Sequence, residues 1–209
     1  MFVERRKNGG GIVMKIYKAC VDYNHNFASC CVDDEACKRL IPEAKNLESW
    51  EMSLWFDGTS RKNGWWPRIM EVCEEGDGPV KPVVGDYTAP LGTGDMILRN
   101  ECIEKLKDVL ENVEILPVYC DFGEYSAVNP MTVLEDCLDL EKSVYRTLPT
   151  ERPILIFEKY FFKKDVVNGH TLFKVMGEEG CNPFVNEEFA EAVKKYGITG
   201  FDFRLVWEG

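Results

Sequence analysis

The stretch PFVNEEFAEAVKKYGITGFDFRLVWEG, residues 183–209, carries the local signals of a strand, a capped helix and a second strand. Asn186 is a favourable N-cap, and Glu187 and Glu188 lie in the first helical turn, where the helix dipole favours negative charge. Gly197 is expected to end the helix. The helix should bury one stripe of side chains: Phe189, Ala192, Val193 and Tyr196. The last strand should turn an aromatic-rich face inward: Phe201, Phe203, Leu205 and Trp207.

A similar order of signals occurs earlier, in MILRNECIEKLKDVLENVEILPVY, residues 96–119. Residues 96–98 are predicted to form a short strand, and Asn100 is the expected N-cap of a helix that ends at Asn112. Residues 115–119 then form a strand, which Pro117 favours at a sheet edge because proline cannot donate a ladder hydrogen bond. The sequence therefore predicts one strand–helix–strand unit twice.

The remaining pattern favours an α+β protein with mixed sheets, a few helices and two lobes, each containing one such unit. Strands are predicted at 14–21, 51–58, 154–157 and 170–175, and helices at 33–40 and from Asn129 onward. Residues 1–13 read as a leader or tag-like segment or as a flexible natural N-terminus, expected in either case to be poorly ordered. The predicted lobes are 14–149 and 150–209, with one compact domain as the alternative.

Charge and hydropathy restrict which kinds of partner the protein can bind and in which compartment it works. The net charge of -11 argues against nucleic acid, because phosphates require lysine and arginine, and it permits a basic protein partner. The sequence contains no apolar run of the roughly 18 residues needed to cross a membrane. Nine scattered cysteines are typical of reduced thiols in a cytoplasm.

The sequence predicts no catalytic residue, metal site or cofactor. His25 and His170 are the only histidines, and both fall in polar or turn segments typical of the surface. Cys20, Cys30, Cys31 and Cys37 lie close together but lack the C-x2-4-C pairs of a structural zinc site. The motifs of serine hydrolases, phosphate-binding loops and zinc proteases are absent. We therefore predict that the protein is not an enzyme, while an unrecognised carboxylate site stays open as an alternative.

Two surfaces are candidates for partner binding. The first is the pair Trp65 and Trp66, of which at least one ring is expected in the core. The second is an acidic surface around an aromatic residue, suited to a basic partner. Its predicted members are Asp121, Glu124, Tyr125, Glu135, Asp136 and Asp139.

Four segments from residue 55 onward carry a family resemblance: WFDGTSRKNGWWP, GDYTAPLGTGDMILRNECIEKLKDVLENVEILPV, EYSAVNPMTVLEDCLDLEKS and FVNEEFAEAVKKYGITGFDFRLVW. The chain resembles bacterial polymorphic-toxin immunity proteins, in particular a type of similar length long known only as a domain of unknown function. Asp139, Ser143 and the terminal GITGF carry most weight, although no functional residue of that family transfers to a position here. The resemblance implies a cytoplasmic antitoxin that binds a cognate toxin domain stoichiometrically. The alternative from another class is a self-assembling structural protein that pairs through its C-terminal strand, for example as a homodimer.

Overall fold

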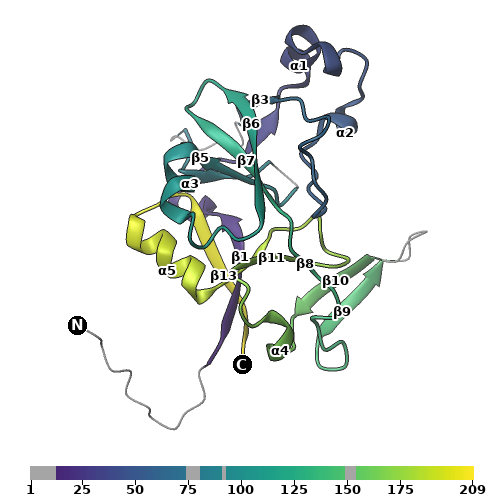
Figure 1. Ribbon diagram of the computed structural model, residues 1–209, viewed down its shortest axis with the longest axis vertical. Coiled ribbons are helices and arrows are strands. Elements are labelled where there is room, and N and C mark those ends of the chain that lie inside the picture. The colour runs from purple at the N-terminus through teal and green to yellow at the C-terminus, as the bar shows by residue number, and fades with distance from the viewer. Residues whose placement is uncertain (1–12, 74–80, 91–92, 149–153) are drawn as a thin grey trace.

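The computed structural model describes residues 13–73, 81–90, 93–148 and 154–209 and shows two mixed sheets and a hairpin with a few short helices (Figure 1). The five-stranded sheet has the order β13 (Phe201–Glu208), β1 (Lys15–Val21), β12 (Phe184–Asn186), β11 (Leu172–Val175) and β8 (Val133–Leu134). The six-stranded sheet has the order β2 (Cys30–Val32), β3 (Arg68–Val72), β6 (Val113–Cys120), β7 (Tyr125–Pro130), β5 (Met96–Arg99) and β4 (Tyr87–Thr88). A separate hairpin pairs β9 (Val144–Leu148) with β10 (Ile154–Lys159). The helices are α1 (Asp34–Leu40), α2 (Ser49–Met52), α3 (Asn100–Leu106), α4 (Lys164–Val167) and α5 (Glu187–Tyr196), with 3-10 turns at Tyr23–His25 and Pro42–Ala44. This confirms the α+β class.

The repeated sequence unit folds into the same topology twice. β5 and β6 flank β7 and both run antiparallel to it, so they are parallel to each other and joined through α3. Likewise β12 and β13 flank β1, both run antiparallel to it, and are joined through α5. Each copy is thus a split β–α–β unit with one antiparallel strand inserted between its two parallel strands. The inserted strand comes from a local hairpin in the first copy and from the N-terminal end of the chain in the second.

The two helices of these units share one core. Cys102 and Leu106 of α3 and Phe189 and Val193 of α5 lie in a single buried cluster, together with apolar side chains from both large sheets. Figure 1 shows α3 and α5 next to each other on the same side of the molecule. Burial of one apolar stripe per helix against the sheets supplies the main favourable contribution to this packing.

The strand β1 is an internal strand of the five-stranded sheet. β1 pairs with β12 on one side and β13 on the other, and Met14 exchanges two main-chain hydrogen bonds with Gly209, of 2.8 and 3.0 Å. The division into lobes at residue 150 stays a prediction, and its boundary residues, 149–153, lie outside the described chain, as do residues 1–12. Strands from both sides of that boundary nevertheless share one sheet, because β1 and β8 pair with β12, β13 and β11.

The cap signals of α5 are confirmed. The Asn186 side chain accepts a hydrogen bond from the Phe189 amide at 3.0 Å, and Gly197 ends the helix in the left-handed conformation with φ 62°. Tyr196, predicted to be buried, is 40% exposed. In β13 the register shifts opposite Ile16 and Tyr17, which leaves Val206 as an extra residue and turns Leu205 outward at 53% exposure.

Two predicted elements are wrong. Residues 51–58 do not form a strand, although Met52, Leu54 and Phe56 are buried as the alternation predicts. The main chain of Phe56 bonds to the side chains of Asp95 and Lys174 instead of to a neighbouring strand. The predicted helix from Asn129 is absent because Asn129 belongs to β7, where its fully buried side chain donates to Glu114 on the adjacent strand.

Two details of the first repeat also differ from the prediction. Asn100 does not cap α3: it is the first helical residue, and its side chain accepts a hydrogen bond from the Ser126 hydroxyl at 2.8 Å. Pro117 does not lie on an edge strand, because β6 has β3 on one side and β7 on the other. Its position is tolerated because β3 pairs only with residues 118–120, so no ladder bond is required from residue 117 on that side.

Candidate partner-binding surfaces

The two histidines and two of the clustered cysteines have the following surroundings. His25 is exposed and bonds through Nδ1 to Asp22 at 2.6 Å, and the His170 ring packs at 6.4 Å against the Phe173 ring. Burial raises the pKa of the Cys30 and Cys31 thiols to about 12, which disfavours the thiolate needed for nucleophilic chemistry.

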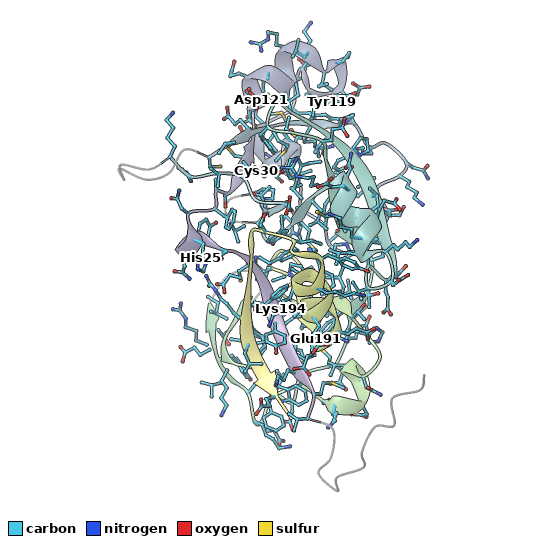
Figure 2. The ribbon with its side chains drawn as sticks, turned by 90° about the vertical axis from the view of Figure 1, so that its left-hand side faces the viewer. His25, Cys30, Tyr119, Asp121, Glu191 and Lys194 are labelled. Atoms are coloured by element: carbon cyan, nitrogen blue, oxygen red, sulfur yellow. The ribbon has the colours of Figure 1, made fainter. Side chains whose placement is uncertain are left out.

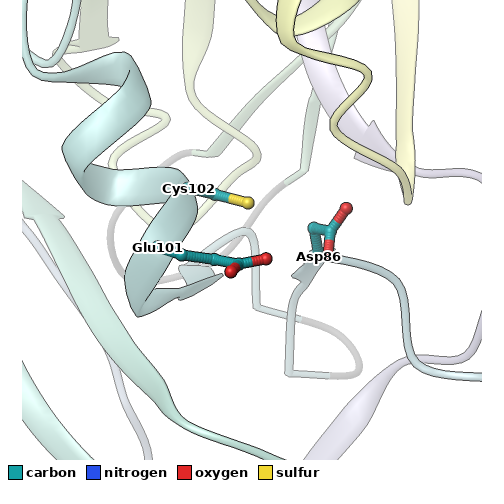
Figure 3. Close-up of side chains that lie close together, drawn as sticks. All are labelled: Asp86, Glu101 and Cys102. Carbon is teal, nitrogen blue, oxygen red and sulfur yellow. The ribbon is translucent and has the colours of Figure 1, made fainter.

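One group of potential metal ligands lies between α3 and the loop before β4. The ligand atoms of Asp86, Glu101 and Cys102 lie within 4.8 Å of one another (Figure 3). Asp86 is already engaged, because it accepts hydrogen bonds from the Arg99 Nε at 3.0 Å and from the Thr199 amide and hydroxyl at 2.9 Å. Burial raises the pKa of the Cys102 thiol, so its metal-binding thiolate is disfavoured. Asp86 therefore serves in structural bonding to Arg99 and Thr199.

That bonding joins two of the segments that carry the family resemblance. Asp86 and Tyr87 of GDYTAPL contact the turn GITGF: the Tyr87 amide donates to the Thr199 carbonyl at 3.0 Å, and the Tyr87 ring stacks on Phe201 at 4.0 Å. A Cβ atom at Gly200, where φ is 93°, would lie 2.2 Å from the Tyr87 carbonyl oxygen, so only glycine fits. Asp139 and Ser143 are likewise structural, since the Ser143 hydroxyl donates to the Asp139 carbonyl and accepts from the Phe161 amide.

The predicted acidic surface is divided between two places. Asp121 and Glu124 are exposed in the turn between β6 and β7, whereas Glu135 and Asp136 follow β8 in the other sheet. Figure 2 shows Asp121 beside Tyr119, and both line a cleft with α1. The labelled Glu191 and Lys194 of α5 lie in the other half of the molecule.

Several predicted site residues are occupied within the protein. Asp136 pairs with Lys163 at 2.6 Å, and Asp139 pairs with Lys142 at 2.7 Å. Tyr125 is only 3% exposed, so it is not the surface aromatic residue that the sequence suggested. Its hydroxyl donates to the Gly85 carbonyl at 2.8 Å and accepts from Arg99 at 2.9 Å, and burial raises its pKa to about 12.

The tryptophan pair divides as expected between core and surface. Trp66 is buried, whereas Trp65 is partly exposed and donates from Nε1 to the Pro117 carbonyl at 3.0 Å. The Arg68 guanidinium stacks on both rings, 4.4 Å from the Trp65 centroid and 3.9 Å from that of Trp66.

Trp65 lines a groove that the sequence analysis missed. The groove has a volume of about 470 Å³ and includes Trp50 and Trp55, which are 75% and 62% exposed. Large exposed aromatic side chains grouped in a concavity are characteristic of partner-binding sites. Trp55 could have been recognised, because the alternation in 51–57 places it on the polar face with Glu51, Ser53 and Asp57.

The wall of this groove, residues 53–67, lies between α2 and β3 and has no regular secondary structure. Buried charged side chains take the place of strand partners. Lys174, 1% exposed, donates from Nζ to the carbonyls of Phe56 and Glu179 at 2.5 and 2.6 Å. Asp95 accepts from the Phe56 amide at 3.1 Å and lies 3.5 Å from the Lys174 ammonium. Burial raises the pKa of Asp95 and lowers the pKa of Lys174, which costs stability that the hydrogen bonds offset.

A second buried charge holds the next part of the wall. Glu114, 6% exposed, accepts hydrogen bonds from the Ser60 hydroxyl at 2.5 Å, the Arg61 amide at 2.7 Å and the Asn129 amide group at 3.1 Å. Desolvation opposes ionisation of Glu114, but these donors, the Arg61 amide first, keep its pKa below the ordinary value. The groove is therefore bounded by main chain fixed from the core.

The comparisons with known proteins agree with the resemblance noted in the sequence. Residues 124–208 match the Immunity protein family (Imm11). No curated protein matches the chain. In the described parts of the chain, no helix is long and apolar enough to cross a membrane.

Proposed function

We propose that this protein is an immunity protein that neutralises a cognate bacterial toxin domain by forming a stoichiometric complex with it. The match of residues 124–208 to an immunity protein family is the observation that carries this proposal. The matched region comprises β7 to β13, which form most of the five-stranded sheet and the second split unit. The proposed action is binding without catalysis or cofactor, and the proposed location is the cytoplasm.

The surface chemistry supports a protein partner. The net charge of -11 favours association with a basic toxin domain and disfavours nucleic acid. Asp121 and Glu124 are exposed and, among the described residues, have no ion-pair partner, so they are available to such a domain. Trp65, Asp121, Glu124 and Glu135 stay candidates for the interface.

The test is co-expression with the toxin domain encoded beside this protein in its genome. We expect a one-to-one complex on co-purification and growth rescue of cells that produce the toxin domain. Calorimetric titration of the purified components supplies the affinity and stoichiometry. Absence of both binding and rescue would remove the proposal.

One observation favours self-assembly as a second candidate function. β13 is an edge strand of the five-stranded sheet and carries the exposed Leu205, so a second copy could pair along it. Light scattering of the isolated protein distinguishes the two functions. A stable dimer that Leu205→Lys converts to a monomer would support self-assembly, whereas a monomer at micromolar concentration would exclude it.

A further inference from the structure

The groove lined by Trp50, Trp55 and Trp65 contains two guanidinium groups, although the whole chain carries a net charge of -11. Its charged lining residues are Glu51, Asp57, Arg61 and Arg68, two of each sign. The groove therefore differs from the acidic turn at Asp121 and Glu124, which exposes carboxylates.

The carboxylates that line the groove are already engaged. Asp57 accepts a hydrogen bond from Arg61 at 3.0 Å and further bonds from the amide and hydroxyl of Thr59. Glu51 accepts from the Glu48 amide at 2.9 Å, within the capping box that begins α2. Arg61 is therefore neutralised by Asp57, and Arg68 is the remaining cation of the groove lining.

Arg68 is a buried guanidinium without a carboxylate partner among the described residues. It is 9% exposed, and it donates from Nε to the Met52 carbonyl at 3.1 Å and from Nη1 to the Trp66 carbonyl at 2.6 Å. A guanidinium has five N–H donors, so these two bonds leave three, one on Nη1 and two on Nη2. Burial lowers its pKa to about 10, so Arg68 remains charged at neutral pH. A buried cation of this kind is stabilised strongly by a bidentate carboxylate.

We infer that the groove binds an acidic segment of the partner protein, with an aspartate or glutamate carboxylate on Arg68 and a neighbouring apolar side chain against Trp50 and Trp55. This inference rests on the proposed function and identifies the surface and the chemistry of recognition. A toxin domain that is basic overall can present such a segment locally. Exposed indoles also stack on nucleic-acid bases, but the two cations of the groove lining, Arg61 and Arg68, are too few to follow a phosphate backbone.

The groove is also suited to binding because its shape exists before the partner arrives. The main chain of its wall is fixed by Lys174, Asp95 and Glu114. The Trp55 indole packs against Gly180, where an added Cβ atom would lie 3.5 Å from the indole Nε1. A preformed site loses little conformational entropy on association, which favours affinity. Trp50 and Trp55 can then act as anchors at modest entropic cost, because an indole side chain has only two rotatable bonds.

The first experiment measures the affinity of variants for the toxin domain in the full chain. Trp50→Ala combined with Trp55→Ala should weaken binding by about 30-fold or more and should abolish growth rescue. Arg68→Lys, which keeps the charge but loses the planar fork, should weaken binding by about 10-fold, and Arg68→Gln by more. Thermal unfolding of each variant separates lost binding from lost folding. Tyr196→Ala, which alters an exposed aromatic residue of α5, is the matched control and should bind normally. Tyr119→Ala tests the cleft beside Asp121 as the competing interface.

The outcomes separate the inference from the proposed function. If wild-type protein binds the toxin domain and the tryptophan and Arg68 variants bind equally well, the groove inference is wrong while the immunity function stands. If Tyr119→Ala weakens binding instead, the interface lies at the cleft beside α1. If wild-type protein neither binds nor rescues, the proposed function fails.

A second experiment tests peptide binding to the groove in the absence of the toxin domain. Acetyl-Asp-Phe-amide at millimolar concentration should shift the indole Nε1–H resonances of Trp50, Trp55 and Trp65, assigned with single Trp→Phe variants. Acetyl-Asn-Phe-amide should leave them unchanged, as should the acidic peptide added to Arg68→Gln. Equal shifts with both peptides, or no shift with the acidic one, would overturn the inference. Shifts with oligouridylate alone would point to nucleic acid.

Discussion

Several buried charged side chains in this protein form hydrogen bonds to the main chain of one segment, which pairs with no strand. A buried ion without hydrogen bonds costs several kcal/mol, so such residues are rarely retained for burial alone. Lys174, Glu114 and Arg68 each bond to main-chain groups of residues 52–66, the stretch that builds the tryptophan groove. Removing any of them should disturb that stretch before it disturbs the sheets.

Lys174→Met tests the strongest of these contacts. It leaves the Phe56 and Glu179 carbonyls without a donor and the Asp95 carboxylate without a counterion, and we expect a loss of about 3–5 kcal/mol in unfolding free energy. Lys142→Met is the control, because this exposed lysine forms a surface pair that should contribute under about 1 kcal/mol. Urea unfolding at neutral pH measures both, and equal stabilities would contradict the assigned role of Lys174.

Glu114→Gln tests the second contact through its pH dependence. The pKa of Glu114 is lowered in the folded protein, so the unfolded chain takes up its proton first as the pH falls. Its stabilisation is therefore present above the ordinary glutamate pKa of about 4.3 and is lost as the pH falls through the lower folded value. Loss of the charge-assisted bonds should cost about 1–3 kcal/mol near pH 7.

Urea unfolding from pH 7 to pH 3 should show the wild type and Glu114→Gln converging in stability as the pH falls. Glu124→Gln, at an exposed position of the same chain, should follow the wild-type curve throughout. A constant difference between wild type and Glu114→Gln at every pH would show that the charge of Glu114 contributes nothing.

At the scale of the elements, the two copies of the split unit use different helix starts. α5 begins with the side chain of Asn186 on the Phe189 amide, whereas α3 begins at Asn100, whose side chain bonds to Ser126 on β7. Similar sequence signals thus lead to a helix cap in one copy and to a helix–sheet contact in the other. The competing hydrogen-bond partner on the adjacent strand decides between them.

The two asparagines form a matched pair for mutation. Asn186→Ala should destabilise the protein by about 1 kcal/mol and increase hydrogen exchange in the first turn of α5, because the Phe189 amide loses its acceptor. Asn100→Ala should leave exchange in the first turn of α3 unchanged, since that side chain caps no amide. Amide hydrogen exchange measured by NMR distinguishes the two asparagines. Equal acceleration in both helices would contradict the conclusion that Asn186 caps a helix and Asn100 does not.

Features that depend on neighbouring residues could be predicted from the sequence, and features that depend on distant ones could not. The caps of α5 and α1 were predictable because cap and amide lie three residues apart in Asn186–Phe189 and Asp33–Ala36. The segment 51–58 was not, because the side chains that bond to Phe56 are 39 and 118 positions away. The helix expected from Asn129 failed for the same reason, since its amide group bonds to Glu114 on another strand.

In the candidate binding surfaces, too, some features could be predicted from the sequence and others could not. Burial of one ring of the tryptophan pair was predicted, but Tyr125 was expected at the surface and is buried by bonds to Gly85 and Arg99. The groove at Trp50 and Trp55 forms only when β11 and the 94–95 loop hold its wall.

At the scale of the whole molecule, the two sheets do not correspond to two consecutive stretches of chain. The family match spans residues 124–208, yet β1 lies between β12 and β13 in their sheet. The Lys15 ammonium also pairs with Glu187 at 2.9 Å, across 172 positions of sequence. The matched stretch is therefore a recognisable sequence unit that lacks one strand of its own sheet.

A fragment comprising residues 124–209 should not fold by itself. In the full chain β1 lies between β12 and β13 and pairs with both. Without β1, each of these two strands would expose an unpaired edge. We expect an amide NMR spectrum with little dispersion, and restoration of a dispersed spectrum when residues 13–123 are supplied as a second chain. A dispersed spectrum from the fragment alone would contradict this prediction.

The position of β1 also has a consequence for biosynthesis. A ribosome produces β1 near the start of the chain, but β12 and β13 follow only after more than 150 further residues. At about 5–20 residues per second, β1 waits on the order of ten to thirty seconds with both of its edges unsatisfied. During that interval its apolar side chains, such as Ile16 and Val21, are available to chaperones or to other nascent chains. The yield of active protein in a cell should therefore depend on translation speed and chaperone supply.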